Sequence, residues 1–249
     1  MNEFCLVCGL LNPMHKVWCT EQKKKIKNNM VELLSHWGDD KMVANCARVS
    51  YAKLADNYTE EQNAKLINYL SKHNHIAPFF HPKLQFRLTI PIYVERQLTK
   101  TSIGVALNQE LDIEINSISG RYVDFSDSYT TIKEWRKQSQ SSKQGSEGMV
   151  DNQLACKHIE QRAIDTCKEA YSMLLSLGVS KEQARTILPL NLNTTFIWTG
   201  SLYALIRLCQ LRLKPDAQIE TQLVVKEMLD LVKNIEGNPF EHTIKAFNL

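Results

Sequence analysis

An alternation of apolar and mostly polar residues between residues 84 and 95 constrains the fold more than any other feature of the sequence. Such a period of two is typical of a strand with one buried face, so the segment needs neighbouring strands and a layer that covers its apolar side. Pro91 cannot donate a ladder hydrogen bond, which indicates that the end of the strand turns or lies at a sheet edge. The apolar positions are Leu84, Phe86, Leu88, Ile90, Ile92 and Val94.

Helical patterns lie on both sides of this strand. Thr59 and Gln62 have the spacing of a capping box and predict a helix that continues to about residue 71. A longer helix is predicted to stop at Gly178, with an apolar face of Ile159, Ala163, Cys167, Tyr171 and Leu174. Further expected elements are a short strand at 111–116, a second capping box at 180–183, and helices at about 196–211 and 217–232. Strands in the middle with helices before and after them predict the α+β class.

Residues 126–153 are rich in Ser, Gln, Gly and charge and predict an exposed loop. A chain of 249 residues is long enough for a sizeable core, and its net charge of +3 does not indicate a nucleic-acid or anionic-membrane partner. The sequence has no run of about eighteen apolar residues, so no membrane span is predicted. None of the nine glycines form a G-x-G pair, which excludes glycine-rich dinucleotide and P-loop phosphate sites.

Seven scattered cysteines, an odd number, indicate a reducing cytoplasm rather than a disulfide framework. The N-terminus has no basic start followed by a long apolar run, so no secretory signal is expected. Cys5, Cys8, His15 and Cys19 have a C-x2-C-x6-H-x3-C spacing that could hold tetrahedral zinc. The alternative is that residues 1–29 form a mobile N-terminal extension, which precedes a single domain at residues 30–249.

Arginines stand in apolar contexts in the second half of the chain, at Arg185, Arg207 and Arg212. A guanidinium is costly to bury unless it meets an anion or several acceptors. These residues therefore indicate either internal salt bridges or an anionic planar ligand. Arg96 and Lys100 add a second charged stretch, one helical turn apart, directly after the strand.

Six segments resemble the flavin-dependent thymidylate synthases in order and in spacing, over about residues 31 to 232. The stretch ARTILPLNLNT (184–194) with LRL…AQIE downstream (211–220) is the most specific of them. The other segments are NCARVSYAK (45–53), LINYLSKHNHIAPFFH (66–81), IPIYVERQL (90–98) and SISGRYVDF (117–125), and the specific stretch itself extends over 183–199.

The resemblance implies an α/β fold with a central, mostly antiparallel sheet flanked by helices. It also implies a homotetramer with active sites between subunits, in the cytoplasm, or in the host cytoplasm if the chain is virus-encoded. The implied reaction makes dTMP from dUMP, with carbon from methylenetetrahydrofolate and reducing equivalents from NADPH through FAD. No protein nucleophile attacks uracil in this family, which agrees with the lack of a recognisable Cys/His or Ser/His/Asp arrangement.

Residue by residue, the resemblance implies that Arg212 is catalytic, because a guanidinium at a uracil carbonyl stabilises the charge that develops as carbon 5 becomes nucleophilic. The implied dUMP-binding residues are Gln97, Lys100, Ser119, Gly120, Arg121, Arg185 and Arg212. The implied FAD-binding residues are Ser50, His75, Lys100, Thr101, Ser102, Ser201, Tyr203 and Arg207. A metal at His73, His75 and His81 is not expected, for want of a carboxylate or cysteine partner nearby.

Departures from the family pattern cluster on the flavin side. Lys100-Thr101-Ser102 stands where the family has R-H-R, and residues 103–115 are longer than the usual four-residue spacing. Ser201 and Tyr203 replace an N-x-R pair, and Ala77 and Phe80 replace Thr and Glu of H-x-T-P-F-E-H. Virus-encoded members vary in the R-H-R triplet, so the resemblance is to a divergent, virus-type member.

Three alternatives stay open beside the synthase. One is a dUMP-binding homologue in which flavin chemistry is impaired or lost. Another is a related transferase that adds a different one-carbon group to carbon 5 of the pyrimidine. The last makes the N-terminal Cys/His segment a separate zinc or nucleic-acid contact.

Overall fold

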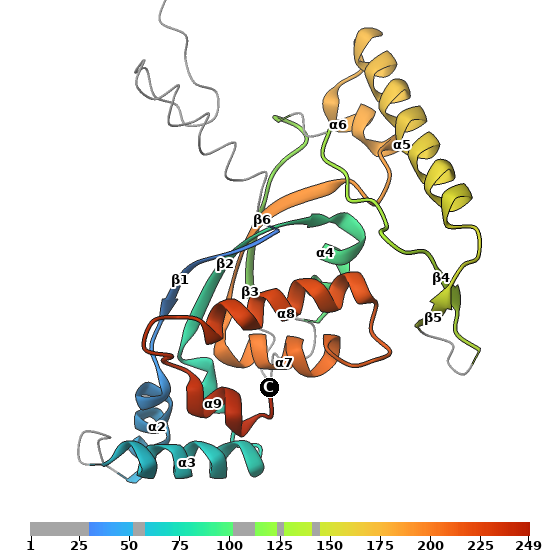
Figure 1. Cartoon of the computed structure of the whole chain (residues 1–249). Helices are drawn as coiled ribbons and strands as arrows, with labels where there is room; N and C mark the ends of the chain where they lie inside the picture. The colour runs from blue at the N-terminus through green and yellow to red at the C-terminus, as the bar shows by residue number, and fades with distance from the viewer. Residues whose placement is uncertain (1–29, 52–57, 102–112, 124–126, 141–144) are drawn as a thin grey trace, which may run out of the picture. The chain divides into compact units, whose positions relative to one another are not determined.

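The computed structural model describes residues 30–51, 58–101, 113–123, 127–140 and 145–249 (Figure 1). The chain divides into Met1–Met30 and Val31–Leu249, and all described residues except Met30 belong to the second unit. Five candidates from the sequence therefore lie outside the described residues, namely Cys5, Cys8, His15, Cys19 and Ser102.

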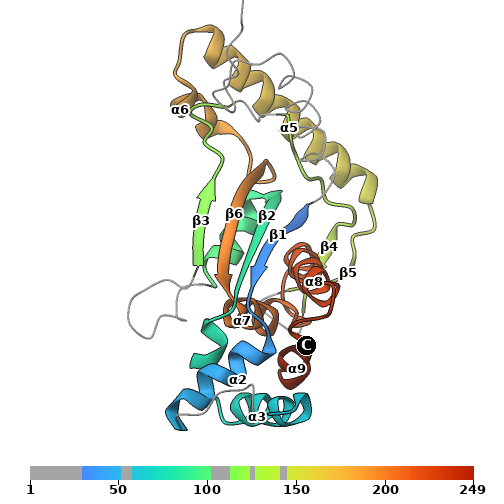
Figure 2. The ribbon, with the colours of Figure 1, turned by 90° about the vertical axis from the view of Figure 1, so that its left-hand side faces the viewer.

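A four-stranded sheet forms the centre of Val31–Leu249. Its order is β1 (Val31–Trp37), β2 (Lys83–Pro91), β6 (Asn193–Ser201) and β3 (Ile113–Ser117), and Figure 2 shows these strands side by side. Every neighbouring pair is antiparallel. The predicted α+β class with a mostly antiparallel sheet flanked by helices is confirmed.

The alternating segment forms a central strand, β2, with Leu84, Phe86, Leu88 and Ile90 fully buried. The strand ends at Pro91, which becomes the N-cap of α4 (Ile92–Thr99), so the prediction of a turn is confirmed and that of an edge is wrong. Proline suits this junction because its fixed φ fits both an extended residue and a helix start, and its missing amide leaves no donor unpaired. The last two apolar positions of the alternation therefore belong to the helix.

The helix predicted at 196–211 is wrong in its first half. Asn193–Ser201 is strand β6, and α7 (Leu202–Arg212) begins only after it. Phe196 and Trp198 are buried on one face between threonines, a period of two that the apolar run after residue 201 obscures. Ser201 then starts α7, because its Oγ accepts a hydrogen bond from the amide of Ala204 at 3.0 Å.

One face of the sheet packs against α7 and α8 (Ile219–Lys233) and forms the core, where the rings of Phe86 and Trp198 lie 5.8 Å apart. The other face is polar, and its side chains bond across strands. The pairs are Gln85 with Thr199 at 3.1 Å, Thr89 with Thr195 at 2.9 Å, and Arg87 with Glu32 at 2.8 Å. The apolar core therefore lies on a single side of the sheet.

Short helices gather at the end of the sheet where β2 begins (Figure 1). They are α2 (Asp40–Arg48), η1 (Val49–Tyr51), α3 (Glu60–Lys72), η3 (Ala77–Phe80) and α9 (Glu241–Ala246). The capping box at α3 is confirmed, with Thr59 and Gln62 bonded reciprocally at 2.9 and 3.4 Å. Asp40 joins α2 to α9, since its carboxylate accepts from the amides of His242 and Thr243.

The long helix is α5 (Gln153–Ser176), and it ends near Gly178, whose φ of +85° gives the expected stop. Its predicted apolar face is only partly right, because Tyr171 is buried but Ile159 is 63% exposed. Helix α6 (Lys181–Ala184) begins after Ser180, whose side chain makes no cap bond, so the second capping box is wrong. The 3-10 turn η4 (Arg185–Ile187) follows it directly.

Residues 126–153 are not a loop throughout. They contain an antiparallel hairpin of β4 (Arg136–Gln138) and β5 (Ser146–Met149), most of whose residues are exposed as expected. Among the described helices, none is both long and apolar enough to cross a membrane.

Candidate active site

A hydrogen-bonded network joins the end of α4 to the end of α7 and the start of α8, and we call its members Gln97, Thr101, Arg212, Gln218 and Thr221 the α4–α8 network. Arg212 Nε donates to Thr101 Oγ1 at 3.3 Å, and its Nη2 donates to the backbone oxygen of Gln97 at 2.8 Å. Thr101 is only 7% exposed. The guanidinium is thus held on the carboxyl end of a helix, where cations are favoured.

The side chain of Gln97 fixes α4 against α8. Its Nε2 donates to Gln218 Oε1 at 2.5 Å, and its Oε1 accepts from Thr221 Oγ1 at 3.1 Å. Thr221 is fully buried. A half-buried amide with both ends bonded has one orientation, so the network sets the relative position of the two helices.

An ion pair next to this network attaches the β4–β5 hairpin to α8. Arg136 Nη2 contacts both carboxylate oxygens of Glu220, at 2.7 and 2.9 Å, and both side chains are mostly buried. Burial raises the pKa of Glu220, but hydrogen bonds from Arg136, its own backbone amide and Gln218 outweigh it and hold that pKa below its usual value. Neither Arg136 nor Thr221 is identified as a site residue from the sequence. Glu220 is included there only as the last residue of the AQIE segment and is given no role.

Four further dUMP candidates lie on two turns. Ser119, Gly120 and Arg121 follow β3, where Ser119 Oγ accepts from the amide and from Nε of Arg121, each at 3.4 Å. Arg185 begins η4 and donates from Nε to the backbone oxygen of Glu182 at 3.4 Å. Both guanidiniums are exposed, so the apolar setting expected for Arg185 is wrong. Across the described residues, no carboxylate pairs with Arg185, Arg207 or Arg212, which disfavours the internal salt bridges.

These candidates share one end of the sheet. Pro91 at the end of β2 pairs with Asn193 at the start of β6, and the amide of Ile118 just after β3 bonds Thr195 in β6. The turn with Arg121, the η4 turn before β6 and the first residues of α4 are therefore attached to the same sheet end. Arg121 and Arg185, from two separate segments, lie on turns attached to this end, which suits a phosphorylated ligand.

The flavin candidates Ser201 and Tyr203 lie at the opposite sheet end, where Lys83 pairs with Ser201. The ring of Tyr203 lies 5.2 Å from that of Phe80 with an interplanar angle of 35°, and 6.2 Å from that of Phe247. Two departures from the family pattern, Phe80 and Tyr203, are thus in contact. Ser201 is fully buried and caps α7.

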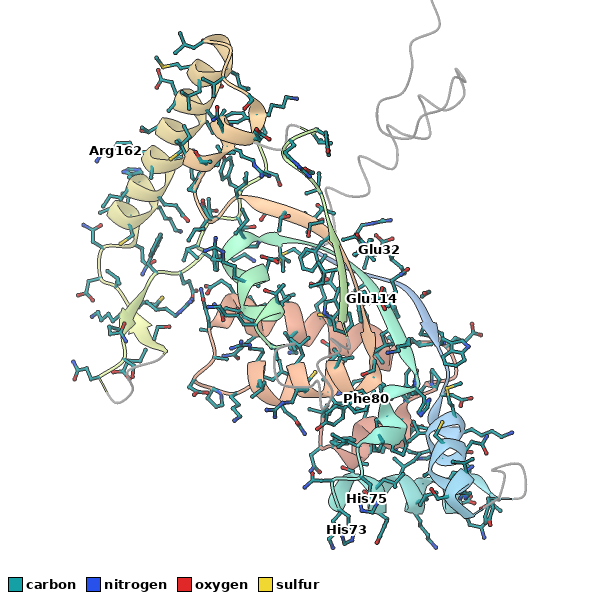
Figure 3. All side chains as sticks on the ribbon, turned by 180° about the vertical axis from the view of Figure 1, so that it is seen from behind. Glu32, His73, His75, Phe80, Glu114 and Arg162 are labelled. Carbon is teal, nitrogen blue, oxygen red and sulfur yellow. The ribbon has the colours of Figure 1, made fainter. Side chains whose placement is uncertain are left out.

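His75 is exposed at the same end, beside α3, as Figure 3 shows for His73, His75 and Phe80. The ring of Tyr69 lies 4.2 Å from that of His73 and 6.0 Å from that of His75. Arg207 is exposed on α7, one turn after Tyr203. In the part of the chain that the structure describes, no three His, Cys, Asp or Glu side chains form a metal-binding group.

The structure therefore separates the candidates into two sets. Ser119, Gly120, Arg121 and Arg185 lie at one end of the sheet, whereas His75, Ser201 and Tyr203 lie at the other. Arg212 is closer to Tyr203, since the two share helix α7 and nine helical positions span about 14 Å. Strand β2 has nine residues, so the two ends are about 27 Å apart. Ser50 belongs to the second set through η1, which follows α2, a helix in contact with η3.

Known proteins of similar sequence share one description. The family model for "thymidylate synthase complementing protein" matches residues 32–236. A flavin-dependent thymidylate synthase of Thermus thermophilus is 34% identical over 211 residues, covering 84% of this chain and 73% of that protein. One from Kosmotoga olearia is 34% identical over 201 residues, covering 80% and 83%.

A solved structure also resembles this fold. It is the UMP/dUMP methylase PolB of Streptomyces cacaoi bound with 5-Br dUMP, with a TM-score of 0.76 and 25% identity, over 88% of this chain and 94% of that one.

Proposed function

Because the chain belongs to the thymidylate synthase complementing family of flavin-dependent thymidylate synthases, we propose that it methylates dUMP to dTMP at a site built around Arg212. The observation that carries this proposal is the fixed guanidinium of Arg212 in the α4–α8 network. A preorganised cation at a pyrimidine carbonyl stabilises negative charge while carbon 5 acts as a nucleophile. The network does this with no protein nucleophile.

The phosphate and sugar of dUMP fit the basic turns after β3 and before β6. Arg121 and Arg185 have exposed guanidinium groups that can bind a phosphate through two hydrogen bonds. Lys100, exposed at the end of α4, can contribute a single positive charge. Ser119 and Gly120 add a turn close to Arg121, and Gln97 stands beside the pyrimidine. The complex of PolB with 5-Br dUMP supports this choice of substrate.

The second set of residues fits FAD in its chemistry. The half-buried rings of Phe80 and Tyr203 offer apolar surface to a flat heterocycle, and the exposed Arg207 offers charge to a diphosphate. His75 and Ser50 would hold the cofactor from the same end, and Lys100 and Ser102 are the remaining assigned residues. Ser201 is fully buried and caps α7, which leaves it no surface for FAD. When bound and reduced, FAD supplies a hydride. NADPH as reductant and methylenetetrahydrofolate as carbon donor complete the proposed reaction.

A homotetramer with shared active sites is part of the proposal, and the separation of Arg121 and Arg185 from His75 and Tyr203 supports it. In the proposed tetramer a second copy brings its His75 and Tyr203 to the turns that carry Arg121 and Arg185, because the two ends of β2 are about 27 Å apart in one protomer. The proposed enzyme works in the cytoplasm, or in the host cytoplasm if a virus encodes it.

The test is dTMP formation by the purified full chain with dUMP, FAD, NADPH and methylenetetrahydrofolate. We expect a flavin absorption spectrum that bleaches with NADPH and dUMP, and tritium release from carbon-5-labelled dUMP. Binding of dUMP with no flavin spectrum and no tritium release would instead identify a homologue that has lost flavin chemistry. Size-exclusion chromatography with light scattering tests the tetramer.

A second candidate function is favoured by the likeness to PolB, a methylase of UMP as well as dUMP. In this case the chain transfers a one-carbon group to carbon 5 of UMP. Parallel assays with UMP and dUMP, read by product mass spectrometry, separate the two functions. A ribonucleotide product formed faster than dTMP would replace the leading proposal.

A further inference from the structure

The backbone oxygen of Gln97 is the anchor of the α4–α8 network. The amide of Thr101 bonds Leu98 O at 3.1 Å, three residues back, which leaves Gln97 O outside the regular helical pattern. That oxygen instead accepts from Thr101 Oγ1 at 2.8 Å and from Arg212 Nη2 at 2.8 Å. The carboxyl end of α4 thus offers two acceptors, Gln97 O and Thr101 Oγ1, that hold the guanidinium of Arg212.

The direction of each bond follows from chemistry. A hydroxyl has one proton, and a carbonyl oxygen can only accept, so Thr101 Oγ1 donates to Gln97 O. Its lone pairs then face Arg212 Nε, which can only donate. The two bonds use two of the five N–H groups of Arg212, and within the described chain the other three have no acceptor. Those three are the groups available to a pyrimidine.

We propose that Thr101 is a positioning residue for Arg212 and not a flavin contact. This inference rests on the proposed function and deepens it, since it assigns Thr101 to the dUMP site. The side chain of Thr101 is buried and both of its polar contacts are internal. The residue at the middle of the altered triplet thereby orients the catalytic guanidinium through its hydroxyl. Serine can replace that hydroxyl, whereas valine keeps the shape and removes it.

The experiment compares Thr101→Val, Thr101→Ala and Thr101→Ser in the full chain. The dissociation constant of dUMP is measured by calorimetry, that of FAD by fluorescence quenching, and carbon-5 proton exchange by tritium release. Thr166→Val is the matched control, since its hydroxyl also donates to a carbonyl four residues back at 2.8 Å, on exposed α5. Melting temperatures accompany every variant.

Both hydroxyl-free variants are expected to weaken dUMP binding and slow tritium release by about tenfold or more, the usual effect of losing a hydrogen bond to a charged group. Thr101→Ser is expected to restore both within about twofold of the wild type, and the FAD dissociation constant should stay unchanged in all three. Rescue by serine is the readout that a merely structural role would not give.

Unchanged dUMP affinity in both hydroxyl-free variants overturns the inference, and so does weaker FAD binding with normal dUMP binding. Failure of the proposed function looks different. In that case the wild type itself makes no dTMP, while the calorimetric comparison of dUMP affinities still reports on Thr101.

Discussion

The aromatic rings of Phe80 and Tyr203 lie against each other at a centroid distance of 5.2 Å, although the residues are 123 positions apart in the sequence. Phe80 ends the 3-10 turn η3, and Tyr203 lies in the first turn of α7. By the resemblance described above, both stand where the family pattern has polar residues. Since the two departures are in contact, one changes the environment of the other, and they are best regarded as a single change from a polar to an aromatic pair.

This pairing predicts coupled effects on stability. Phe80→Glu places a carboxylate against the Tyr203 ring in a half-buried position and should cost about 1–3 kcal/mol of the free energy of unfolding. Adding Tyr203→Arg supplies a partner charge and should recover about 1 kcal/mol of that loss. Urea unfolding of the two single variants and the double variant measures the coupling. Strictly additive effects would contradict it.

Arg212→Lys should lower kcat for dTMP formation by roughly a hundredfold, because an ammonium cannot reach Gln97 O, Thr101 Oγ1 and a pyrimidine at once. FAD affinity should be unchanged. Steady-state kinetics with a fluorescence titration of FAD provide the test. Arg87→Lys is the control, since Arg87 lies in a partly exposed ion pair on the polar sheet face. Retention of more than a third of the wild-type kcat in Arg212→Lys would remove Arg212 from the catalytic role.

Glu220→Gln should destabilise the protein at neutral pH by about 1–3 kcal/mol, because the Arg136 pair is mostly buried. The folded-state pKa of Glu220 lies below its ordinary value of 4.5, so its contribution is present above pH 4.5 and is lost as pH falls through the folded pKa. The stability gap between the wild type and the variant should therefore narrow at low pH. Urea titrations at pH 7 and pH 4 check this, with Asp151→Asn in the exposed Lys137 pair as a control of little effect. A gap that widens toward pH 4 would refute the assignment.

Gly200→Ala should cost about 1–3 kcal/mol of stability although Gly200 has ordinary strand geometry. A Cβ there would lie 2.6 Å from Trp198 Cη2 and 2.8 Å from Cζ2, and Trp198 is fully buried. Trp198→Phe removes those ring atoms, so Gly200→Ala should lower the stability less in the Trp198→Phe background than in the wild type. Thermal unfolding of the double-mutant cycle decides, and an equal cost of Gly200→Ala in both backgrounds would show that the contact does not matter.

Cys209 should resist alkylation in the folded protein. Burial raises the pKa of its thiol to about 12, so almost no thiolate exists at pH 8. Iodoacetamide labelling followed by mass spectrometry should modify the partly exposed Cys156 and Cys167 first, and Cys209 only in urea. Labelling of Cys209 at the same rate as Cys156 under native conditions would show that α7 opens readily.

The sequence predicts the fold best where pattern and environment coincide. Strand β2 lies between two strands with one apolar and one polar face, so its alternation is regular. Strand β1 has a register shift between Leu33 and Ser35, and that irregularity hides its period. In β6, Thr195 and Thr199 are polar but β-branched, and the apolar helix that follows makes the whole segment read as helical.

The site is predictable in its arginines and not in their partners. Arg212 stands in a recognisable segment, but its contact with Thr101 joins residues 111 positions apart. Arg136 and Glu220 likewise meet across 84 positions. No local spacing encodes such contacts, since they depend on how α4, α7 and the hairpin pack. Which residue holds a guanidinium is therefore a property of the tertiary structure.

Helix α7 begins at Leu202 and ends at Arg212, so a single rigid helix of eleven residues carries Tyr203 from one set and Arg212 from the other. One residue inserted into its middle would advance Arg212 by about 1.5 Å and rotate it by about 100° relative to Tyr203. Point substitutions on the surface of α7 would leave the position of Arg212 relative to Tyr203 unchanged. Helix α7 thus fixes the distance and the angle between Tyr203 and Arg212. Its surface side chains can therefore vary in evolution far more freely than its length.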